Sequence, residues 1–133
     1  MLRATALIVL MLTLTNLFGQ TTLSFCASVE PNGYCIFNNV KFISTPDSNT
    51  TRIYMEVRNP DGISSTKITY KIYIIDKDGK ETLAHSLEQE IQKDWAVSWQ
   101  PEIFPSPGKF SVKVFNDAGQ QICGKAFELF RDW

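Results

Sequence analysis

The stretch TRIYMEVR, residues 51–58, decides the fold. Its apolar residues Ile53, Met55 and Val57 alternate with polar or amphipathic neighbours, and in an extended chain every second side chain points to the same face. A helix would scatter these three side chains around its surface. The stretch therefore predicts a β-strand that is buried on one face.

The same alternation returns at residues 67–76, after a turn signal at Asn59-Pro60-Asp61-Gly62. Ile68, Tyr70, Ile72 and Ile74 occupy every second position, and β-branched and aromatic residues favour strands. Asp78-Gly79 follows directly, and this dipeptide is a strong hairpin signal. The chain should therefore fold straight back after residue 76.

The returning segment, Glu81–Lys93, allows two interpretations. Leu83, Leu87 and Ile91 recur every fourth residue, as on a helix, and they also satisfy strict alternation with His85 between them. We favour a strand with these side chains inward, because the preceding hairpin turn needs a partner strand. A partly helical segment is the alternative.

The remaining chain continues the pattern of short strands separated by turns. Strands are expected at residues 22–29, 35–43, 95–99, 109–115 and 120–129, with a turn at residues 116–119. Seven or eight short strands at regular spacing are typical of an all-β, two-sheet antiparallel β-sandwich.

The N-terminus has the features of an export signal. Arg3 precedes an apolar stretch from Ala4 to Leu14, and small and polar residues follow. We expect residues 1–20 to be a signal peptide and residues 21–133 to be one β-sandwich domain that is secreted or periplasmic. A retained membrane anchor is the alternative, although the apolar stretch is shorter than the roughly 20 residues that span a bilayer.

Three cysteines in an exported chain suggest one disulfide. A two-residue hairpin loop at Asn32-Gly33 would keep Cys26 and Cys35 out of register with each other. We therefore expect Cys123 to pair with Cys35 or Cys26. Three buried, reduced thiols are the alternative.

The C-terminal part carries a resemblance. The run Pro107-Gly108-Lys109-Phe110-Ser111-Val112-Lys113-Val114-Phe115, followed by the turn at 116–119, resembles the last hairpin of small bacterial immunoglobulin-like or fibronectin-type-III-like domains. The run Trp95-Ala96-Val97-Ser98-Trp99 is similar to the tryptophan-bearing strand that precedes it there, and we expect its tryptophan face in the core. The resemblance implies an immunoglobulin-like fold and no particular activity.

No group of residues points to catalysis, a cofactor or a metal. His85 is the single histidine, the cysteines lack paired spacing, and no nucleophile motif or phosphate-binding loop is present. The net charge of −1 comes without a basic patch, which argues against nucleic-acid binding. We therefore expect a protein that is not an enzyme and needs no cofactor.

Binding is the remaining class of function. Tyr54, Tyr73 and Phe115 fall on the otherwise polar faces of three strands, where they would form an aromatic platform for a protein or glycan ligand. The sequence thus predicts an exported, non-catalytic binding module without a stable membrane span after signal cleavage. The alternatives are a small secreted enzyme using a free cysteine or loop carboxylates, and a structural subunit that assembles through an edge strand.

Overall fold

The computed structural model describes residues 20–36, 38–39, 41–44, 51–104 and 106–131. The predicted signal peptide lies almost wholly outside these residues. The described chain forms the following strands: β1 (Thr22–Cys26), β2 (Ser28–Val29), β3 (Cys35–Ile36), β4 (Lys41–Ser44), β5 (Thr51–Arg58), β6 (Lys67–Ile75), β7 (Glu81–Glu90), β8 (Val97–Phe104), β9 (Gly108–Phe115) and β10 (Gln121–Arg131).

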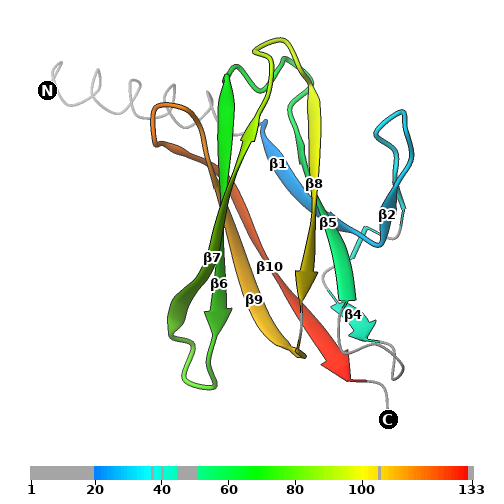
Figure 1. Cartoon of the computed structure of the whole chain (residues 1–133), viewed down its shortest axis with the longest axis vertical. Coiled ribbons are helices and arrows are strands. Elements are labelled where there is room, and N and C mark those ends of the chain that lie inside the picture. Colours follow the sequence, from blue (N-terminus) through cyan, green and yellow to red (C-terminus); the bar gives the residue numbers. More distant parts are fainter. Residues whose placement is uncertain (1–19, 37, 40, 45–50, 105, 132–133) are drawn as a thin grey trace, which may run out of the picture.

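These strands form two main sheets, and the all-β prediction is confirmed. One sheet has the order β4-β10-β9-β6-β7 and the other the order β1-β5-β8, while β2 and β3 form a separate hairpin. Every pairing is antiparallel except that of β4 with β10. Figure 1 shows β6, β7, β9 and β10 in one layer and β1, β5 and β8 in the other, with the β2 hairpin beside the smaller sheet.

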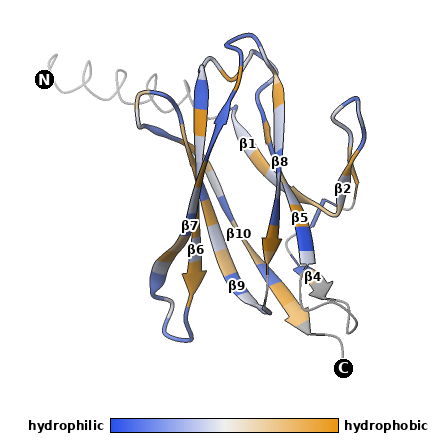
Figure 2. Ribbon diagram, in the orientation of Figure 1, coloured by the Kyte–Doolittle hydropathy of each residue, from blue (hydrophilic) through white to orange (hydrophobic). Residues whose placement is uncertain are grey.

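Alternation decides which side chains enter the core. On β5, Ile53, Met55 and Val57 are fully buried, while Arg52 and Arg58 are exposed. On β6, Ile68 and Tyr70 are buried as expected. The alternating hydrophobic and hydrophilic bands along β9 in Figure 2 follow the same rule.

An aromatic cluster joins the sheets at the centre of the core. The ring of Phe127 on β10 lies 4.6 Å from that of Phe25 on β1, 4.9 Å from that of Phe104 on β8 and 5.3 Å from that of Phe110 on β9, measured between centroids. The first two pairs are tilted or edge-to-face and the third is stacked, and such spacings are favourable for aromatic pairs. One side chain therefore links strands from both layers.

Residues 81–90 form a strand and not a helix, but the expected inward face of β7 is only partly correct. Leu87 is half-buried and Ile91 is buried, whereas Leu83 and His85 are exposed. The β-bulge at Ala84 pairs Leu83 with the outward-facing Tyr73, so Leu83 lies on the outer face of the wider sheet. His85 pairs with Ile72 and keeps the inner face, but β7 is the last strand of this sheet and the narrower facing sheet does not cover it. Ile74 on β6 is exposed for the same reason.

The tryptophan face of β8 was also predicted wrongly as core. Ser98 is buried between the sheets, so Val97 and Trp99 point to the outer face of the smaller sheet. The hairpin turn covers them there: a Cβ on Gly33 would come within 3.3 Å of Val97 Cγ1 and 3.6 Å of Trp99. Gly33 also has a positive φ of 83°, so two constraints favour glycine at this position.

The disulfide joins Cys26 to Cys35, which corrects the expected pairing of Cys123 with Cys35 or Cys26. The loop of the β2–β3 hairpin is longer than two residues, since Glu30 N donates to Tyr34 O at 3.0 Å. The chain also bends between β1 and β2 at Ala27, which brings the end of β1 beside β3. Cys123 keeps a free thiol.

A polar bridge connects the sheets at one end of the sandwich. Gln89 on β7 accepts hydrogen bonds from the Tyr70 and Ser98 hydroxyls, each at 2.8 Å, and its amide nitrogen donates to the Trp99 carbonyl at 3.0 Å. The Trp99 carbonyl belongs to the edge strand β8, so Gln89 takes the place of a neighbouring strand there. Burial raises the pKa of Tyr70, whose neutral hydroxyl serves as a donor.

We predict that Gln89→Leu lowers the free energy of unfolding by about 2 kcal/mol, because it leaves the Tyr70 and Ser98 hydroxyls without their acceptor. Urea unfolding measures the change. The matched control is Gln92→Leu, at an exposed glutamine on the next loop, where a change within about 0.5 kcal/mol is expected. Equal effects of the two substitutions would contradict a stabilising bridge.

Candidate functional site

The two sheets diverge along their shared edge, from the Gln89 bridge toward the β6–β7 turn. Four residues before Gln89 on β7, the nearest polar contact between the two edges is longer: His85 Nε2 lies 3.8 Å from Glu102 Oε2 on β8. Beyond this pair a cavity of about 280 Å³ opens between the sheets. We call this region, with the edges of β7 and β8 that border it, the open side.

The cavity of the open side is mainly apolar. Its walls come from β6, β7, β8, β9 and the β8–β9 loop: Ile72, Ile74, Ala84, His85, Glu102, Ile103, Phe104, Ser106 and Phe110. Ile74 and Ile103 remain 48% and 49% exposed. Two of the six large, exposed hydrophobic side chains of the described residues thus line one cavity. Such gathering marks interaction surfaces more often than single exposed residues do.

The open side also presents an unpaired strand edge. β7 pairs with β6 alone, so one row of its backbone groups has no strand partner among the described residues. Glu81, Glu88 and Glu90 lie toward its ends, while residues 82–86 beside the cavity carry no carboxylate. A β-bulge at Ala84 interrupts the register here, because Ile72 pairs with His85 and Tyr73 pairs with Leu83.

His85 is therefore not the core histidine that the sequence suggested. Its side chain is 56% exposed at the rim of the cavity, beside Glu102. Ser106 also lines the cavity, but no hydrogen bond joins it to His85 within the described residues. Burial raises the pKa of the Cys123 thiol to about 12, so Cys123 is a poor nucleophile, and it does not line this cavity. The absence of catalysis stays a prediction.

The predicted aromatic platform is divided between the sheets. Tyr73 on β6 and Phe115 on β9 share the outer face of the larger sheet, whereas Tyr54 lies on β5 in the smaller one. Lysines cover both rings, with Lys113 Nζ 4.8 Å from the Tyr73 centroid and Lys71 Nζ 4.8 Å from the Phe115 centroid. A stacking ligand would have to displace these cations.

Charge neutralisation further limits this outer face. Lys113 Nζ lies 2.8 Å from Glu81 Oε2, a hydrogen bond that raises the pKa of Lys113, and Lys67 Nζ lies 3.4 Å from Glu88 Oε1. An open depression of about 370 Å³ beside Phe115 has Lys67 and Lys71 in its lining. Ligand binding by Tyr54, Tyr73 and Phe115 stays a prediction.

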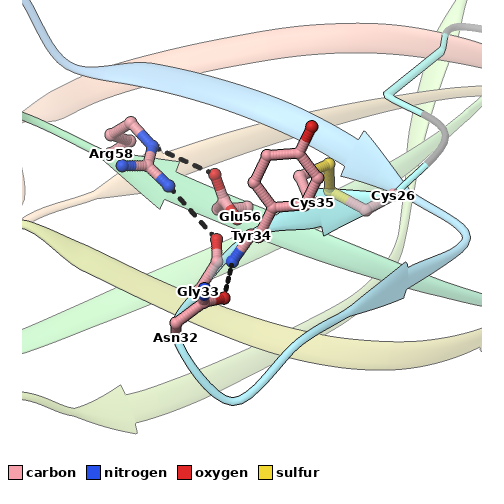
Figure 3. The surroundings of a disulfide bond; sticks show 7 residues. All are labelled: Cys26, Asn32, Gly33, Tyr34, Cys35, Glu56 and Arg58. Carbon is pink, nitrogen blue, oxygen red and sulfur yellow. Dashed lines mark hydrogen bonds and ion pairs between the residues drawn. A yellow bond between two sulfur atoms is a disulfide. The ribbon is translucent and has the colours of Figure 1, made fainter.

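Figure 3 shows a third cluster, around the disulfide. Arg58 Nε lies 3.2 Å from Glu56 Oε1, and the same guanidinium donates to the Gly33 carbonyl at 3.1 Å. Glu56 is only 3% exposed although its position on β5 points to the outer face, because the β2–β3 hairpin lies over it. The Cys26 and Cys35 sulfurs and a carboxylate oxygen of Glu56 lie within 4.8 Å of one another.

Sequence reasoning missed this cluster and the open side. Cys26, Cys35 and Glu56 have no spacing typical of a shared site, and their proximity depends on the bend at Ala27 and the hairpin loop. The exposed cavity depends on where the smaller sheet ends, which alternation along one strand does not encode. Glu56 faces outward on β5, the strand that pairs with β1, but no sequence rule predicts that it lies near the cysteines.

No family model matches the chain, and neither does any curated protein sequence. A solved structure does match: an immunoglobulin-like protein from Pseudomonas aeruginosa, with a TM-score of 0.53 and 12% sequence identity. The match covers 80% of this chain and 90% of that one. The chain has an immunoglobulin-like fold. At this identity the likeness shows the fold alone, and it confirms the resemblance inferred from the C-terminal hairpin.

In the part of the chain that the structure describes, no helix has the length and apolar character needed to cross a membrane.

We predict that thiol counting on the unreduced, unfolded protein finds one thiol, that of Cys123, and that reduction raises the count to three. In the folded protein, Cys123 should react slowly with a thiol reagent. Its rate should rise about tenfold per pH unit from pH 7 to 9, because the thiolate is the reactive form and the pKa is about 12. Two or three free thiols before reduction would contradict the Cys26–Cys35 pairing.

Proposed function

We propose that this chain is an exported, non-catalytic interaction module that binds an extended segment of a partner polypeptide along β7, with one apolar side chain of that segment in the cavity of the open side. The observation that carries the proposal is the position of an apolar cavity directly beside a free strand edge. The disulfide is compatible with an oxidising compartment.

The size and lining of the cavity favour a side chain over a free small molecule. At about 280 Å³ it falls just below the range of about 300 to 1,000 Å³ for small-molecule sites. Its lining offers few polar groups to orient a free ligand, chiefly His85, Glu102 and Ser106. An added strand would be oriented instead by backbone hydrogen bonds to β7, while its alternate side chains would confer specificity.

The distribution of charges along the free edge of β7 fits a partner segment with an apolar residue at the cavity and polar residues beyond it. Residues 82–86 beside the cavity lack carboxylates, and Glu88 and Glu90 follow on the same strand. On β8, Pro101 has no backbone N–H, so this edge offers one donor fewer for strand addition. We therefore place the partner on β7 and not on β8.

The proposal is tested by selecting peptides from a random display library on the immobilised domain and measuring the affinity of the winners by titration. We expect extended peptides with a large apolar residue, and Ile103→Lys should weaken them at least tenfold because it places a charge at the cavity mouth. The matched control is Tyr34→Lys, an equally drastic change at the exposed Tyr34 of the β2–β3 turn, which should leave binding unchanged.

Selected peptides that bind Ile103→Lys as tightly as the unaltered domain would contradict the proposal. Chemical-shift changes in titrations with labelled protein then locate the true surface. Changes confined to Tyr73 and Phe115 would favour the outer face of the larger sheet. Concentration-dependent dimerisation that Ile103→Lys abolishes would instead identify a second copy of this chain as the occupant of β7.

A further inference from the structure

The Glu56 carboxylate beside the disulfide has one oxygen with a partner and one without. Glu56 Oε1 pairs with Arg58, but Glu56 Oε2 is buried and has no hydrogen-bond partner among the described residues. Buried polar atoms without partners are uncommon in folded proteins, and an ion is one established explanation. Residue Glu56 is 3% exposed, so bulk water does not compensate this oxygen.

The disulfide places two potential soft ligands near the Glu56 carboxylate. Each Cys sulfur and one Glu56 carboxylate oxygen lie within 4.8 Å of the other two atoms. In a tetrahedral zinc site with bonds of about 2.3 Å to sulfur and about 2.1 Å to oxygen, the ligand atoms are about 3.6 to 3.8 Å apart. Movements of about 1 to 2 Å would bring the three groups to that spacing once the sulfurs are no longer bonded.

We propose that, after reduction of the disulfide, the thiolates of Cys26 and Cys35 and the Oε2 atom of Glu56 form a binding site for a soft divalent cation of the zinc class. Thiolate ligands select such cations over calcium or magnesium. Three protein ligands leave a fourth position open to water. This site is separate from the open side and does not depend on the proposed function.

Charge and hydrogen bonding around the cluster support a cation there. Two thiolates and one carboxylate carry three negative charges, and a divalent cation together with the Arg58 guanidinium balances them. Arg58 fixes the carboxylate through Oε1 and is itself held by the Gly33 carbonyl, so Oε2 remains available as a ligand. Outer contacts of this kind orient metal ligands.

Reduction and binding balance as two steps. A dithiol reductant gives two electrons and two protons to the Cys26–Cys35 bond, the S–S bond breaks, and the reductant becomes a disulfide. The cation then displaces the two thiol protons to solvent and forms two metal–sulfur bonds. The oxidised protein offers no thiolate, so the site exists only in the reduced form.

The test uses the full chain with Cys123→Ser, which removes the third thiol. The protein is reduced with a phosphine, freed of the phosphine without oxygen and titrated with Co²⁺, a spectroscopic substitute for Zn²⁺. We expect a near-ultraviolet sulfur-to-cobalt charge-transfer band and the visible bands of tetrahedral Co²⁺, at one ion per chain. Zn²⁺ should abolish these bands, and unreduced protein should not give them.

Glu56→Gln should weaken Co²⁺ binding about tenfold or more, because an amide oxygen is a neutral and weaker ligand. The matched control is Glu30→Gln, at an exposed carboxylate of the same hairpin, which should leave the affinity unchanged. Absence of the charge-transfer band in the reduced protein would overturn the proposal. Equal Co²⁺ affinities of the Glu56→Gln variant and of the protein with Glu56 intact would also overturn it, since Glu56 would then not be a ligand.

Discussion

The packing of two sheets of unequal width over one shared core is the constraint on which the other features depend. Five strands face three, so the apolar faces of β5 and β9 are covered, while part of the inner face of β7 and the end of β6 at Ile74 are not. Packed sheets also rotate relative to each other because their strands twist, and their edges diverge as a result. Gln89 holds the edges together at one end, and the cavity opens where no such bridge reaches.

The β2–β3 hairpin covers the outer face of the smaller sheet, which no second sheet covers. The outer face of β5 and β8 carries Glu56, Val97 and Trp99, which would otherwise be open to solvent. The disulfide fixes the base of the hairpin, and Arg58 holds its tip through the Gly33 carbonyl. A buried carboxylate beside two sulfurs is a consequence of this covering.

The sequence allowed the strands to be predicted well and their surroundings poorly. Alternation placed β5 at its observed bounds and identified Ile53, Met55, Val57, Ile68 and Tyr70 as core, because period and burial are properties of one strand. Leu83 and His85 obey the same period in the sequence, yet the bulge at Ala84 turns Leu83 to the outer face, and the burial of His85 depends on whether another sheet lies above it. Likewise, the partner of Cys35 depended on one loop length and one bend. Neither the cover over β7 nor the partner of Cys35 can be read from the spacing of residues along the chain.

The covered core and the free edge of β7 should differ in how well their backbone amides are protected from hydrogen exchange. Residue-resolved amide hydrogen exchange of the free protein tests it in one measurement. The account predicts strong protection throughout β5, β6 and β9 and two classes of amide in β7, protected toward β6 and rapidly exchanging toward the free edge. Uniform protection along β7 would contradict the account, because another segment would then already occupy the edge that we assign to a partner.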